Sequence, residues 1–163
     1  MAEEGLLEAI LDAWDRNNRI IVNLLRAVPP GGMEARAVEG SPTVAEMFAH
    51  MIYVRAVFLR EDIPEFGLGE PRDWIPVRDP EQLAAGLEAS ARAVGEAFAA
   101  CVSRGQAMQV HYDHLLFLEH MIWHEGYHHG QIKLALKIAG QPLENKAIGP
   151  LTWRVWMNKS DQR

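Results

Sequence analysis

Several features that would define a class of function are scarce or absent in this sequence. The 163 residues include a single cysteine, Cys101, so the chain forms no intrachain disulfide and does not depend on an oxidising compartment. The net charge is −6, and the lysines and arginines are scattered among acids rather than gathered into the basic surface of a nucleic-acid binder. No apolar run approaches the roughly 20 residues that span a bilayer. The first residues, with Glu3 and Glu4, lack the basic-then-apolar pattern of a secretion signal. We therefore expect a cytoplasmic protein that binds neither nucleic acid nor membrane.

Alternating strand patterns are also nearly absent, and helical periodicity takes their place. Apolar residues recur every three or four positions in four segments. These segments are residues 7–28, 41–58, 79–105 and 113–140. The expected N-caps of the last three are Ser41, Asp79 and Asp113. Helices of matched length bury their apolar faces best as a bundle, and the connections after the first two are long enough to cross its end. The sequence predicts an all-α four-helix bundle with long crossover connections, a single domain over residues 1–163.

A short C-terminal extension follows the last of these helices. After Pro150 it holds Trp153 and Trp156, which share a face if this segment is helical. Two readings stay open: the tryptophans cover the bundle core, or they contact a second copy of the chain, since tryptophan is favoured at interfaces.

Histidines are concentrated in the fourth predicted helix, which holds or adjoins six of the 7 in the chain. His120, His124 and His128 are four residues apart and stack on one face. Two imidazoles at this spacing can reach one ion at roughly 2.0–2.1 Å. All three cannot, because the outer two lie about 12 Å apart along the helix axis. The ligand pair is therefore His120 with His124 or His124 with His128.

A third ligand must come from another helix, and His50 in the second predicted helix is the natural candidate. Taken alone, a histidine at the edge of an apolar face is more often a hydrogen-bonded core residue. Three protein ligands would leave coordination positions free, as in catalytic rather than structural sites. Imidazole accepts zinc, nickel and iron alike, so the sequence predicts one divalent transition-metal ion without naming it.

Residues 124–128 read His-Glu-Gly-Tyr-His and match the H-E-x-x-H pattern of zinc proteases, in which the glutamate acts as a base on water. Glu125 is therefore a candidate catalytic residue, and Tyr127 is a second for an acid/base or supporting role. The alternative is that Glu125 orients a histidine or lies in solvent. A zincin-like peptidase is the weakest functional reading, because no strand is predicted to align a peptide. Its third ligand would also have to be Glu144, beyond the break near Pro142.

Residues 124–132, with two histidines four apart followed by a Gly-Gln pair, resemble the fourth helix of the DinB/YfiT-like superfamily. This is the damage-inducible metal-binding family, not the DNA polymerase that shares the name. Residues 41–50 resemble the segment that carries the first histidine ligand of this family, and residues 14–18 resemble its first helix more weakly. The resemblance implies a four-helix bundle, often a homodimer, in which three histidines hold the metal. The implied ligands are His50, His124 and His128.

The resemblance also implies a range of activities. Some relatives transfer low-molecular-weight thiols such as bacillithiol, mycothiol or glutathione, and others are described as metal-dependent hydrolases. The leading hypothesis is a metal-dependent thiol S-transferase or hydrolase with a small-molecule substrate, and the alternative is a non-catalytic metal-binding stress-response protein. No motif identifies a thiol pocket. The candidates to line one are Arg55, Arg60, Arg72 and Trp74, and the alternative is that these scattered arginines lie in solvent. An enzyme should have a cavity opening at the metal, a binding protein a shallow site, and a peptidase a strand beside the fourth helix.

Overall fold

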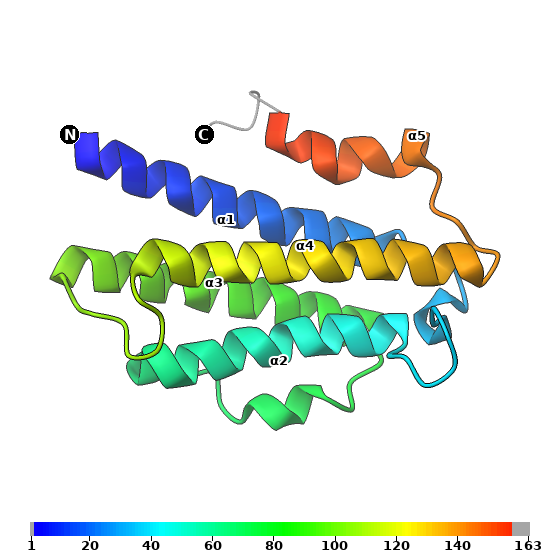
Figure 1. Ribbon diagram of the computed structural model, residues 1–163, viewed down its shortest axis with the longest axis horizontal. Coiled ribbons are helices and arrows are strands. Elements are labelled where there is room, and N and C mark those ends of the chain that lie inside the picture. Colours follow the sequence, from blue (N-terminus) through cyan, green and yellow to red (C-terminus); the bar gives the residue numbers. More distant parts are fainter. Residues whose placement is uncertain (1, 158–163) are drawn as a thin grey trace.

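Four long helices lie side by side in the computed structural model, which describes the backbone of residues 2–157 and the side chains of residues 5–157 (Figure 1). These helices are α1 (Ala2–Arg26), α2 (Val44–Asp62), α3 (Pro80–Arg104) and α4 (His114–Ile138). No strand occurs between residues 2 and 157, so the prediction of an all-α four-helix bundle is confirmed. None of the described helices combines the length and the apolar character that crossing a membrane requires.

The helices do not simply alternate in direction. α1 and α4 run one way along the bundle, whereas α2 and α3 both run the other way (Figure 1). Residues 63–79, with the short helices η2 (Pro64–Phe66) and η3 (Pro71–Trp74), must therefore return along the bundle to start α3. Residues 27–43, which include η1 (Gly32–Glu34), stay at one end (Figure 1). One of the two predicted crossovers thus spans the length of the bundle.

Local capping sets the starts of the helices. The N-cap of α2 is Thr43 and not Ser41 as predicted, because Thr43 forms a capping box with Glu46. Its hydroxyl oxygen accepts the Glu46 N–H at 3.2 Å, and the Glu46 carboxylate accepts the Thr43 N–H at 2.8 Å. Asp79 and Asp113 cap α3 and α4 as predicted.

The apolar core has two parts with a polar layer between them. One part includes Leu25 and Met47, and the other includes Trp14 and Phe117. Between them each helix contributes a buried polar residue. The four are Asn17 from α1, Arg55 from α2, Ser90 from α3 and Glu125 from α4.

The C-terminal extension consists of short helical turns that pack along α1 (Figure 1). They are α5 (Asn145–Ile148), η4 (Gly149–Leu151) and η5 (Trp153–Met157). The Arg16 guanidinium donates to the Val155 carbonyl at 2.6 Å, and Val155 is buried. Trp153 and Trp156 are 51% and 44% exposed, so about half of each side chain is covered, and the reading that they cover the core stays a prediction. Their contact with a second copy of the chain stays a prediction.

Candidate metal centre

Three imidazoles from two helices converge at one point on the bundle. His124 Nε2 lies 3.2 Å from His50 Nε2 and 3.1 Å from His128 Nε2. One ligand atom from each of the three residues lies within 4.8 Å of the others. Nitrogens bound to one ion at roughly 2.0–2.1 Å would be about 3.0–3.4 Å apart. The three side chains therefore form a group that could hold a metal ion.

The helix arrangement explains why these histidines meet. His124 and His128 are one turn apart on α4, and α2 runs antiparallel beside α4, which places His50 opposite them. His120, the other partner that the spacing allowed, turns away and contacts His111 instead, with a nitrogen separation of 3.0 Å. The structure thus joins His50 to the pair His124 and His128.

The surroundings keep all three imidazoles neutral near pH 7. Burial, together with the nearby His128 and His50, lowers the pKa of His124 to about 4. Burial is also the main cause that lowers the pKa of His50 and of His128. Neutral imidazole offers the lone pair that a metal needs. His128 Nδ1 lies 2.8 Å from the Gln131 side-chain oxygen, so Nδ1 carries the proton and Nε2 keeps its lone pair.

The group faces outward rather than into a closed core. His50 is exposed, and His124 and His128 are half-buried. The Tyr127 ring meets His128 edge-on with centroids 5.3 Å apart, and it stacks on Trp123 at 6.1 Å. Tyr127 and Trp123 are 55% and 70% exposed, so an open aromatic surface borders the site.

Glu125 points into the bundle and not into solvent, since it is only 1% exposed. Arg55 donates to both of its carboxylate oxygens, from Nε at 2.6 Å and from Nη2 at 2.8 Å. The Asn17 amide donates to the same carboxylate at 2.6 Å. A catalytic role for Glu125 stays a prediction, but these three donors favour a positioning role, because they occupy both oxygens that would take up a proton.

Arg55 is the functional neighbour that sequence reasoning misassigned. It is fully buried, its guanidinium lies 4.8 Å above the Trp14 ring, and it also donates to the Leu87 carbonyl at 2.8 Å. It therefore cannot line a thiol pocket. The feature of the sequence that could have indicated its burial is the position of a charged residue inside the apolar segment of the second helix, five residues after His50.

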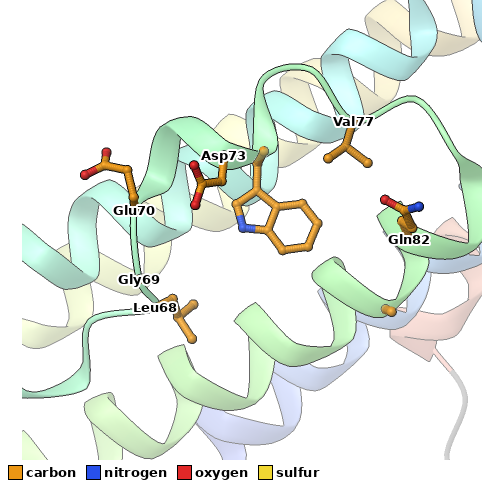
Figure 2. Close-up of a pocket in the computed structure, with 8 residues that line it drawn as sticks. Leu68, Gly69, Glu70, Asp73, Val77 and Gln82 are labelled. Carbon is orange, nitrogen blue, oxygen red and sulfur yellow. The ribbon is translucent and has the colours of Figure 1, made fainter.

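The other proposed pocket residues do not gather at the histidines either. Arg60 forms a surface ion pair with Glu70 at 3.2 Å, and Arg72 is exposed. Trp74 lies in a separate hollow of about 480 Å³ between the crossover and α3 (Figure 2). The lining residues are Leu68, Gly69, Glu70, Asp73, Trp74, Val77, Gln82 and Ala85. A larger hollow of about 1020 Å³ follows α1 and α3, and neither hollow is lined by the three histidines.

The features that would mark a peptidase are not found in the described part of the chain. Residues 2–157 contain no strand that could align a peptide beside α4. Glu144, the candidate third ligand of a zincin, is the N-cap residue of α5 and does not belong to the histidine group.

Fold and site together define an all-α bundle with an open group of three histidines able to hold a metal ion. The chain belongs to the DinB family, because the model of that family matches residues 1–146. Searches of curated proteins and of solved structures each gave no match.

Proposed function

We propose that the protein is a metal-dependent enzyme of the cytoplasm, a thiol S-transferase or a hydrolase of the DinB/YfiT-like type. His50, His124 and His128 hold one divalent ion of zinc, nickel or iron. The observation that carries the proposal is the convergence of three neutral imidazoles at a site open to solvent. Three protein ligands leave positions for a small-molecule substrate, with a low-molecular-weight thiol as the leading class.

The bound ion supplies Lewis acidity, which shifts the pKa of a water or a thiol toward neutrality. The protein supplies position. Gln131 fixes the tautomer of His128, and the Arg55–Glu125 pair ties α2 to α4 beside the ligands. Tyr127 is the candidate for proton transfer, since its ring borders His128.

A second candidate is a non-catalytic metal-binding stress-response protein. The observation that favours it is that the hollows along α1 and beside Trp74 share no residue with the histidine site. A zincin-like peptidase is the least favoured, since neither a strand nor a free carboxylate adjoins the histidines in the described residues.

We also propose that the protein is a homodimer. Five large apolar side chains, spaced seven or four residues apart, form the outer stripe of α4, and each is at least 46% exposed. The outer stripe consists of Leu116, Trp123, Tyr127, Leu134 and Ile138. Gly130 lies on the same stripe with open space above its Cα, so a second helix can approach closely there.

The metal assignment is tested by measuring the metal content of the purified protein and of His124→Ala. We expect about one tightly bound ion per chain in the wild type and its loss in His124→Ala. His129→Ala is the matched control, because His129 is the next residue after His128 but lies outside the group. Equal metal content in wild type and His124→Ala would remove the ligand assignment.

Activity is tested separately on the metal-loaded protein. It is incubated with bacillithiol, mycothiol or glutathione together with an electrophile, and with ester and amide substrates. Turnover that disappears in His124→Ala but not in His129→Ala supports the enzyme. Absence of both transfer and hydrolysis, with metal still bound, favours the binding protein.

A further inference from the structure

A second pair of imidazoles meets one helical turn before the first site. His120 on α4 faces His111 in the connection before α4, and His111 Nε2 lies 3.0 Å from His120 Nδ1. This separation is close to the 3.1 and 3.2 Å between the nitrogens of the first group. Phe58 packs against both rings, with its centroid 5.1 Å from each, and holds them in place.

A buried carboxylate orients His111. Asp62 Oδ2 lies 2.7 Å from His111 Nδ1, and Asp62 Oδ1 accepts the backbone N–H groups of Val110 and His111 at 2.7 and 2.9 Å. His111 Nδ1 therefore carries a proton, and its Nε2 presents a lone pair to His120. A histidine whose far nitrogen donates to a carboxylate is the usual arrangement of a metal ligand with its supporting group.

A nearby positive charge would stabilise the negative charge of Asp62. Its side chain is fully buried, and it is the last residue of α2, where the helix dipole disfavours a negative charge. Within residues 5–157, no lysine or arginine forms an ion pair with it, and the side chain that contacts it is the His111 imidazole. A buried carboxylate without a compensating positive charge is costly. A metal ion on the opposite nitrogen of His111 would provide that charge through the imidazole.

We propose that His111 Nε2 and His120 Nδ1 form a second binding site for a divalent transition-metal ion, supported by Asp62. Water completes the coordination, because no third histidine, cysteine or carboxylate ligand joins the two imidazoles among the described residues. His120 is exposed, so its proton can move from Nδ1 to the solvent-facing Nε2 when the ion binds, with no net loss of a proton. His120 and His124 are four residues apart, about 6 Å along the helix axis, so the two sites hold separate ions.

With two protein ligands instead of three, the second site binds more weakly than the first. Its existence does not depend on the activity proposed above. It requires only that His111 and His120 bind an ion independently of His124.

The test is a titration of the metal-free full-length protein with Zn²⁺ against a chromophoric chelator, which gives the number of ions and their affinities. We expect two ions per chain, with affinities that differ at least about tenfold. His120→Ala should lose the weaker ion and keep the tighter one, whereas His124→Ala should lose the tighter ion and keep the weaker one. Because His120 is exposed, its replacement does not threaten the fold.

Asp62→Asn should weaken the second site about 10–100-fold and leave the first unchanged, as expected for a carboxylate that supports a ligand. Circular dichroism checks that this variant is folded. His114→Ala is the matched control, because His114 lies on the same helix but bonds to the Gln106 carbonyl. Its titration should equal that of the wild type.

Three results would overturn the proposal. One is a single ion per chain in the wild type that His124→Ala loses and His120→Ala keeps, which would mean that His111 and His120 share only a hydrogen bond. Another is loss of the weaker ion in His114→Ala as well as in His120→Ala, which would mean nonspecific binding by surface histidines. The third is an unchanged weaker affinity in His120→Ala. Failure of the first site alone would instead show as a single ion in the wild type that His120→Ala loses and His124→Ala keeps.

Discussion

The buried ion pair between α2 and α4 gives the sharpest prediction about stability. Arg55 and Glu125 side chains are each 1% exposed, and two hydrogen bonds of 2.6 and 2.8 Å join them. Glu125→Gln keeps the shape and volume of the side chain and removes its charge. The guanidinium of Arg55 then stays buried without a counter-charge.

The expected cost follows from this burial. Removing the charge of one partner of a buried pair destabilises a protein by about 3–5 kcal/mol, because the other charge remains desolvated. A protein of this size loses roughly 2–4 °C of Tm per kcal/mol. Glu125→Gln should therefore lower Tm by about 6–20 °C.

Urea unfolding of the metal-free protein, followed by circular dichroism, measures the change in the free energy of unfolding. Arg60→Ala is the matched control, because Arg60 and Glu70 form a pair at 3.2 Å whose side chains are about half exposed. Its cost should stay below about 1 kcal/mol. The double variant Arg55→Met/Glu125→Leu should recover most of the stability that Glu125→Gln loses, since no unpaired charge remains.

A Glu125→Gln variant whose free energy of unfolding lies within about 1 kcal/mol of the wild-type value would refute the reasoning, because an unpaired buried Arg55 should cost more than that. The same variant separates the two roles of Glu125. A positioning role predicts lower stability together with weaker metal binding, since the pair holds α2 against α4. A purely catalytic role predicts lost activity at unchanged stability and metal affinity.

Three further predictions concern pH, packing and assembly. Because the pKa of His124 is lowered in the folded state, the unfolded chain binds a proton at this residue more readily than the folded chain does. The free energy of unfolding of the metal-free protein should therefore decrease as pH falls from about 6.5 toward 4, whereas His124 should contribute no change above pH 6.5. Urea unfolding at several pH values checks this, and an equal slope in His124→Ala would contradict it. Gly86→Ala would place a Cβ 2.4 Å from the Trp74 ring and should cost about 1–3 kcal/mol in thermal unfolding, whereas Gly95→Ala, with 3.7 Å to its nearest neighbour, should be tolerated. Light scattering should give the mass of a dimer for the wild type and of a monomer for Trp123→Lys, and a monomeric wild type would exclude the homodimer.

The local features of the fold could be predicted from the sequence because they depend on neighbours in the chain. Periodicity of apolar residues gave the four helices, and Asp79 and Asp113 marked the starts of two of them. The choice of Ser41 over Thr43 was wrong because both residue types can cap a helix. The reciprocal bond from Glu46 selects Thr43.

The candidate site, too, could be predicted from the sequence only in part. The four-residue spacing left His120 with His124 and His124 with His128 as possible ligand pairs, and the bundle made His50 the candidate third ligand. The resemblance to a family then selected His124 with His128. Gln131 and Arg55 act through contacts that periodicity does not encode. A buried arginine inside an apolar helix face can be recognised as half of an ion pair only when its partner on another helix is known.

What the sequence by itself determined is the set of helices, their caps and the face on which each histidine lies, since these follow from hydrogen bonds and side-chain spacing within one or two turns. Only the tertiary structure decided that α2 and α3 run in the same direction, that Glu125 meets Arg55, and that Asp62 supports His111. These two side-chain pairings join residues 70 and 49 positions apart. They depend on which apolar faces pack together most closely, and many arrangements of the same four helices satisfy the local rules equally well.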